Sequence, residues 1–107
     1  MPQLPDLLFR TLADPTRRAI FERLCRDGEQ TVVALTAPSG ISQPAVSKHL
    51  AVLKQAGLVR DRRAGRSTHY SARPDALAPL VDWTSQMTEF WERRFDALDD
   101  LLKRMDQ

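Results

Sequence analysis

Four arginines lie around a short turn in the second half of the chain, namely Arg60, Arg62, Arg63 and Arg66. Ser67 and His69 follow, and Asp61 is the one acidic residue close by. Like charges at an exposed turn repel one another, so the cluster is unfavourable unless an anion neutralises it. Phosphates along a nucleic-acid backbone or beside its minor groove are such anions. The arginines therefore predict a phosphate-binding turn.

A second polar set precedes the arginines, on a segment whose spacing predicts a helix. The outer side of this helix presents Gln43, Pro44, Ser47, Lys48 and Lys54. Gln pairs bidentately with adenine, Ser pairs with several bases, and Pro44 or Ala45 can touch a thymine methyl group. Lys48 and His49 lie within reach of phosphates, and the helix start at Ser42 offers free N–H groups. The alternative is an ordinary solvated helix face.

The elements that position these residues follow from apolar spacing and capping residues. Helices are expected at residues 4–13, 15–26, 32–37 and 43–56. Asp14, Thr31 and Ser42 are the predicted N-caps of the last three. In the second helix, Ile20 and Leu24 are expected to face inward beside Ala19 and Phe21. In the fourth, Val46, Leu50 and Leu53 recur at intervals of four and three, so they form one core-facing stripe.

The rest of the chain predicts a hairpin and a long helix. Residues 58–63 and 66–72 are strand candidates joined by Ala64-Gly65, and Pro74 opens a final helix that runs to about Met105. The expected fold is a mainly α winged helix-turn-helix with a small β-hairpin. Residues 1–107 are interpreted as one domain, with the helix-turn-helix at 31–57 and the wing at 58–73.

Composition and charge restrict the function classes. A chain of 107 residues with 42% apolar content supports one modest core. It has no apolar run long enough for a membrane span and no signal peptide at its start, which favours a soluble cytoplasmic protein. Residues 1–73 hold 12 Lys and Arg against 6 Asp and Glu, a net charge of +6, whereas residues 74–107 hold 4 against 8, a net charge of −4. Only the first part is expected to meet a polyanion.

Three stretches, DPTRRAIFERL, ISQPAVSKHLAVLKQAGLV and RDRRAGRSTHYSA, resemble the ArsR/SmtB family of bacterial winged-helix repressors. The resemblance covers roughly residues 5–73, and SQPAVSKHL is its most specific part. It implies that the helix after Ser42 reads the major groove and that the hairpin is the wing. The DNA contacts that it implies are Ser42, Gln43, Pro44, Ser47, Lys48, His49, Arg62, Arg63 and Arg66. Arg17 belongs to the DPTR motif and is assigned to structural pairing.

The metal sites that recur in this family lack their ligands here. Residues 32–37 contain no Cys or His, and the final helix contains no His, because the two histidines are His49 and His69. No metal and no cofactor are therefore expected. The lone Cys25 is interpreted as a small buried residue on a helix, with a redox thiol as the alternative. No Ser/His/Asp arrangement or Gly-rich phosphate loop suggests an enzyme.

The long final helix carries an apolar stripe that a small core cannot cover completely. We expect the helices at residues 1–13 and 74–107 to pair with those of a second copy. The predicted interface residues are Leu4, Leu8, Trp83, Met87, Phe90, Trp91, Phe95 and Leu98. Packing of the stripe within one chain is the alternative. A pocket between paired helices, lined by Trp83, Met87, Phe90 and Trp91, is a candidate site for a small apolar effector.

The hypothesis from sequence is a homodimeric transcriptional repressor that binds double-stranded DNA at an inverted-repeat operator, without response to metals. Two alternatives stay open. One is a repressor with a metal- or thiol-sensing site at an atypical position. The other is a winged-helix module that binds another protein.

Overall fold

The computed structural model describes residues 4–106, and the chain divides into two units after Leu77. The first unit, here called the body, contains four helices and three strands. They are α1 (Leu4–Ala13), α2 (Pro15–Asp27), β1 (Gln30–Thr31), α3 (Val32–Thr36), α4 (Gln43–Gln55), β2 (Val59–Ala64) and β3 (Ser67–Ala72). The second unit holds α5 (Ala78–Met105). No helix among residues 4–106 is both long and apolar enough to cross a membrane.

The three predicted N-caps are confirmed, and each begins its helix by the same hydrogen bond. Asp14 Oδ1 accepts from the backbone N–H of Arg17 at 3.0 Å, and Thr31 Oγ1 accepts from that of Ala34 at 3.1 Å. Ser42 Oγ accepts from the backbone N–H of Ala45 at 3.3 Å. Each side chain satisfies a donor that the first helical turn leaves without a partner.

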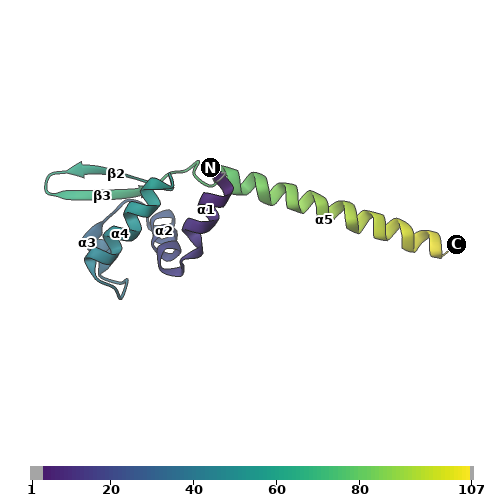
Figure 1. Ribbon diagram of the computed structural model, residues 1–107, viewed down its shortest axis with the longest axis horizontal. Helices are drawn as coiled ribbons and strands as arrows, with labels where there is room; N and C mark the ends of the chain where they lie inside the picture. Colours follow the sequence, from purple (N-terminus) through teal and green to yellow (C-terminus); the bar gives the residue numbers. More distant parts are fainter. Residues whose placement is uncertain (1–3, 107) are drawn as a thin grey trace. The chain divides into compact units, whose positions relative to one another are not determined.

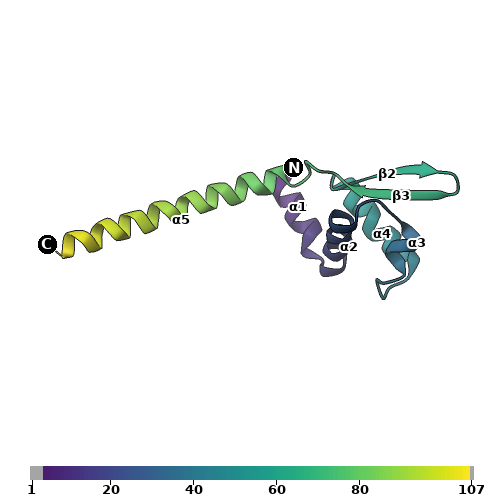
Figure 2. The ribbon, with the colours of Figure 1, turned by 180° about the vertical axis from the view of Figure 1, so that it is seen from behind.

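The helices of the body lie on one side of the β2–β3 hairpin, whose turn reaches beyond them (Figure 1). Figure 2 shows the same arrangement from behind. The sheet is antiparallel with strand order β1-β3-β2. The hairpin turn is Gly65-Arg66, one residue later than predicted, and Gly65 has φ +62°. A positive φ at the first central residue is what a type II′ turn requires, and glycine adopts it without strain.

The core of the body forms around the inner side of α4. Val46, Leu50 and Leu53 are fully buried, as the spacing predicted, and Leu58 joins them just after the helix. From α2, Ile20, Phe21 and Leu24 are buried as expected. Ala19 and Cys25 were expected to be buried as well, and both are exposed. Cys25 lies at the edge of the core, where it lines a pocket with Phe21 and Leu24.

One strand and the start of one helix also differ from the prediction. Strand β1 was not predicted, because two residues show no periodicity that a sequence pattern can reveal. Helix α5 begins at Ala78 rather than at Pro74, so the first helical turn contains Pro79 instead. Either proline suits a helix start, where its missing N–H is not needed, and the sequence alone does not separate them.

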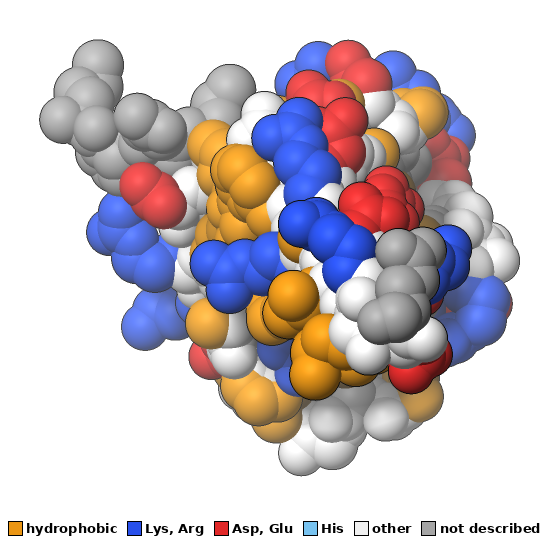
Figure 3. Space-filling view, turned by 90° about the vertical axis from the view of Figure 1, so that its right-hand side faces the viewer, with side chains coloured by type: hydrophobic (Ala, Val, Ile, Leu, Met, Phe, Trp, Pro, Cys, Tyr) orange, Lys and Arg blue, Asp and Glu red, His pale blue; other side chains and the backbone are white. Residues whose placement is uncertain are grey.

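Helix α5 is amphipathic along its whole length. None of its described residues is buried, and its large apolar side chains Phe90, Trp91, Phe95 and Leu98 are 51–64% exposed. The Trp91 and Phe95 rings lie 6.2 Å apart, and Arg94 lies 5.9 Å from the Trp91 ring. Figure 3 faces the C-terminal end of the chain and shows hydrophobic side chains beside acidic and basic ones.

Shortening a core side chain of α4 should destabilise the body strongly. Leu50 is fully buried, so Leu50→Ala leaves a cavity and should lower the free energy of unfolding by roughly 2–5 kcal/mol. Gln55→Ala, on the exposed side of the same helix, should change it by less than about 0.5 kcal/mol. Urea denaturation followed by circular dichroism measures both values. Equal losses in the two variants would contradict the assignment of the core.

The N-cap of α2 should make stability depend on pH. The hydrogen bond from the Arg17 backbone holds the pKa of Asp14 below its ordinary value of 3.8. A lowered pKa in the folded state adds stability that is fully present above the ordinary value and is lost as pH falls through the lowered one. Asp14→Asn keeps the hydrogen-bond acceptor but cannot ionise. Its deficit in unfolding free energy should be constant at neutral pH and shrink below about pH 4; a deficit independent of pH would refute this role.

Candidate nucleic-acid interface

The outer side of α4 is polar and exposed over most of its length. Gln43, Pro44, Ser47 and Lys48 are all exposed, as is the cap residue Ser42. Burial of the opposite stripe fixes the rotation of the helix, because side chains three and four residues apart share a face. The structure therefore presents hydrogen-bonding side chains and the N-terminal N–H groups of α4 on one surface.

His49 does not share that surface. It is half-buried, and its Nδ1 atom is fully buried. It lies three residues after Val46 and next to Leu50, so it falls toward the inner side of the helix. The buried Nδ1 atom is not available to a phosphate, and a phosphate contact from the rest of the His49 side chain stays a prediction.

The hairpin places its arginines on two different faces. Successive residues of a strand point to opposite sides, so Asp61 and Arg63 share one face and Arg60 and Arg62 share the other. The Asp61 face is turned toward α4, because Lys54 Nζ lies 3.0 Å from Asp61 Oδ1. Lys54, expected on the open face of α4, is thus partly neutralised by the hairpin.

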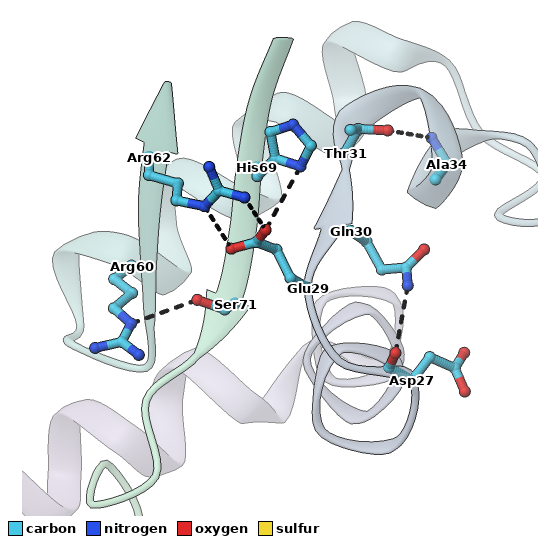
Figure 4. Close-up of polar contacts among 9 residues, drawn as sticks. All are labelled: Asp27, Glu29, Gln30, Thr31, Ala34, Arg60, Arg62, His69 and Ser71. Atoms are coloured by element: carbon cyan, nitrogen blue, oxygen red, sulfur yellow. Dashed lines mark hydrogen bonds and ion pairs between the residues drawn. The ribbon is translucent and has the colours of Figure 1, made fainter. Parts of the chain in front are cut away.

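Three of the wing arginines form no ion pair among residues 4–106. Arg60 Nε donates a hydrogen bond to Ser71 Oγ at 3.4 Å (Figure 4). Arg63 and Arg66 are exposed, and among residues 4–106 the side chain of neither forms an ion pair or a hydrogen bond. Arg66 stands in the hairpin turn itself, and Arg63 is one residue from the end of β2. These two side chains are the best-placed anion ligands of the hairpin.

Unlike Arg63 and Arg66, Arg62 forms an ion pair with an acidic side chain, that of Glu29, which the sequence did not predict. Its Nη2 lies 2.6 Å from Glu29 Oε1 and its Nε lies 3.0 Å from Glu29 Oε2 (Figure 4). His69 Nδ1 is 3.7 Å from Glu29 Oε1. The hydrogen bonds with Arg62 lower the pKa of Glu29 and raise that of Arg62. Contrary to the prediction, Asp61 is therefore not the one acidic residue near the arginines, because Glu29 lies 33 residues before Arg62 in the chain and pairs with it.

The residues predicted for self-association fall into three groups. Trp83, Phe90, Trp91, Phe95 and Leu98 of α5 are exposed, and Met87 is half-buried. Leu8 is only 2% exposed within one chain, so it belongs to the core of the body and offers almost no surface to a partner. The side chain of Leu4 lies outside the described part of the structure.

No metal-binding cluster occurs among the described residues. No three His, Cys, Asp or Glu side chains between residues 4 and 106 come close enough to hold one ion. The Cys25 side chain is exposed on α2, yet the partial burial of its thiol raises its pKa, and Glu22 adds to this effect. A raised pKa lowers the fraction of reactive thiolate at neutral pH.

Comparison with known proteins gives a consistent result. A family model described as a helix-turn-helix domain matches residues 12–62. The HTH-type transcriptional regulator Rv2034 of Mycobacterium tuberculosis is 43% identical over 98 residues, which are 92% of this chain and 88% of the relative. The arsenical resistance operon repressor of Escherichia coli is 44% identical over 103 residues, which are 95% of this chain and 85% of the relative.

Solved structures agree with these sequence matches. A crystal structure of an ArsR family transcriptional regulator superposes with a TM-score of 0.76 at 32% identity and covers 84% of this chain and 98% of that one. An ArsR-like transcriptional regulator from Rhodococcus sp. RHA1 gives a TM-score of 0.73 at 29% identity, covering 89% of each chain. These relatives are transcription regulators.

Proposed function

The chain belongs to the ArsR family of winged helix-turn-helix transcriptional regulators, and on that premise we propose that it is a homodimeric, metal-independent repressor acting at an inverted-repeat operator. The observation that carries the proposal is the exposed polar side of α4 next to a hairpin with two unpaired arginines. The major groove of DNA is wide enough for an α-helix such as α4, and a basic hairpin beside the helix can reach phosphates or the minor groove.

Base readout is assigned to α4. Gln43 and Ser47 lie one turn apart on its exposed side, and Lys48 adjoins them. A glutamine amide reads adenine with two hydrogen bonds, whereas serine and lysine donate to several acceptors on base edges. The capped N-terminus of α4 is suited to a phosphate. Operator sequence preference therefore depends chiefly on Gln43.

Sequence-independent affinity is assigned to the hairpin. Arg63 and Arg66 have no acidic partner among residues 4–106, so binding to phosphate does not first break an ion pair. Each phosphate that they neutralise releases condensed counterions from the DNA, and this makes binding salt-dependent. The same contacts form on any duplex, since phosphates carry no sequence information.

Self-association is assigned to α5. Leu80, Met87, Trp91, Leu98, Leu101 and Met105 follow one another at intervals of three, four or seven residues. On the opposite side, Asp82, Glu89, Asp96 and Lys103 recur every seven residues. At 1.5 Å per residue, the 28 residues of α5 form a helix about 42 Å long, and the apolar stripe runs along most of it. An apolar stripe of that length is unfavourable in water, and the same helix of a second copy is the simplest cover.

Metal independence is proposed because the chain offers too few suitable ligands. Cys25 is its one cysteine, and both histidines lie in the body, with His69 already beside Glu29. Zinc and thiophilic metals need several Cys or His ligands. The name of the Escherichia coli relative refers to arsenical resistance, so arsenite belongs among the conditions tested.

The first experiment is a fluorescence-anisotropy titration of the protein against its own upstream DNA and a scrambled duplex. It is run at several salt concentrations, with and without zinc or arsenite. We expect tight binding to the upstream DNA alone, two protomers per site and no effect of either addition. Weak and equal binding to both duplexes would instead favour a protein-interaction module. Release of DNA by zinc or arsenite would establish a sensor site at an atypical position.

Readout and phosphate binding should separate by mutation. Arg63→Gln and Arg66→Gln should weaken binding to every duplex and reduce the slope of log K against log salt by about 0.9 per lost phosphate contact. Gln43→Ala should leave that slope unchanged and cost roughly 1–3 kcal/mol of discrimination at one base pair of each half-site. Equal losses of specific and non-specific binding in all three variants would refute this division.

A charge in the apolar stripe of α5 should abolish the dimer. Leu98 is 51% exposed in one chain, and Leu98→Asp would bury a carboxylate in the paired helices. We expect sedimentation velocity to show a dimer for the wild type and a monomer for the variant at micromolar concentration. Asp96→Ser, on the charged side of α5, is the matched control and should stay dimeric. A dimeric Leu98→Asp protein would exclude this face as the interface.

A further inference from the structure

The ion pair between Glu29 and Arg62 takes no part in the base and phosphate contacts of the proposed function. It is bidentate, with distances of 2.6 and 3.0 Å, and it occupies the same fork of N–H donors that a phosphate would take (Figure 4). Arg62 is therefore already neutralised, unlike Arg63 and Arg66. An arginine held in this way by its own chain is a poor candidate for a direct phosphate contact.

The position of Glu29 shows what the pair joins. Glu29 directly precedes β1, whose residues Gln30 and Thr31 pair with Tyr70 and His69 of β3. His69 in turn pairs with Arg62 of β2. The Glu29 carboxylate thus reaches across β3 to the far strand, so a two-residue edge strand gains a side-chain link to the hairpin. That link connects the end of α2 with the middle of β2.

A second ion pair holds the same strand from the other side. Asp61, next to Arg62, points to the opposite face and pairs with Lys54 of α4 at 3.0 Å. Two adjacent residues of β2 are therefore fixed in opposite directions, one to the segment before β1 and one to α4. The hairpin beyond them carries Arg63 and Arg66. Fixing the strand at this point determines where those two arginines stand relative to the outer side of α4.

We propose that Glu29 is a positioning residue of the wing, which holds Arg62 so that the hairpin presents Arg63 and Arg66 to DNA. Arg62 then contributes to DNA binding through the position of the hairpin and not by touching phosphate. This inference rests on the proposed function, since it concerns how the wing meets DNA. It predicts that Glu29 and Arg62 behave as a unit in mutation experiments, although one is acidic and the other is basic.

The test compares Glu29→Gln, Arg62→Gln and the double variant in anisotropy titrations with upstream DNA. All three should lose affinity by the same factor, roughly two- to fivefold, the range that an exposed ion pair supports. The slope of log K against log salt should stay at the wild-type value, whereas Arg63→Gln should reduce it by about 0.9 per lost contact. Glu22→Gln, which removes an exposed acidic residue of α2 whose ion-pair partner is Arg18, is the control for the change in net charge.

Charge reversal adds a test of the link itself. Glu29→Arg should weaken binding, and adding Arg62→Glu in the same chain should restore part of the loss, because the pair re-forms with its charges exchanged. Two outcomes would overturn the proposal. The first is a reduced salt slope for Arg62→Gln, like that of Arg63→Gln, which would show that Arg62 contacts phosphate. The second is tighter DNA binding by Glu29→Gln than by Glu22→Gln, which would show that Glu29 merely competes with DNA for Arg62.

Hydrogen exchange of the free protein tests the link without DNA. The hairpin amides should exchange faster in Glu29→Gln and in Arg62→Gln than in the wild type, while those of α4 stay unchanged. Unchanged exchange in the hairpin would overturn the positioning role even if DNA binding were altered. Conversely, if the wild type binds no DNA specifically, the proposed function fails while this measurement still reports on the link.

Discussion

The burial of Val46, Leu50 and Leu53 on one side of α4 is the constraint from which the rest of the interface follows. These side chains are fully enclosed, so the helix cannot rotate without exposing them to water. The opposite side of α4 is then fixed toward solvent, and it carries Gln43 and Ser47. The surface that we propose for base recognition is in this way determined by apolar packing on the far side of the same helix.

The basic residues around the hairpin differ in whether an acidic side chain neutralises them, and the net charge of the chain does not show this difference. Lys54 and Arg62 are each neutralised by an acidic residue of the same chain, Asp61 and Glu29. Arg63 and Arg66, farther toward the turn, are not. The charges of Lys54 and Arg62 therefore hold the strand, whereas the charges of Arg63 and Arg66 stay available to a polyanion.

The comparisons and the structure describe complementary parts of the protein. The helix-turn-helix match ends at residue 62, within β2, and the solved relatives extend the likeness to most of the chain. Helix α5 contributes a different kind of surface, with exposed aromatic side chains instead of basic ones. In the proposed function the body contacts DNA, and α5 pairs with the α5 of a second copy, so that two bodies can bind the two halves of an inverted repeat.

The sequence by itself determined what depends on neighbouring residues. The caps Asp14, Thr31 and Ser42 and the stripe of α4 were predicted correctly, because both are set by spacing within one helix. Only the tertiary structure decided that Glu29 meets Arg62, because β1 is too short to leave a pattern and the two residues are 33 positions apart. It also decided that His49 lies toward the inner side of α4 and that Leu8 joins the core of its own chain. Residue type shows that a side chain can bind an anion or an apolar surface, whereas the packing of distant segments decides which partner reaches it first.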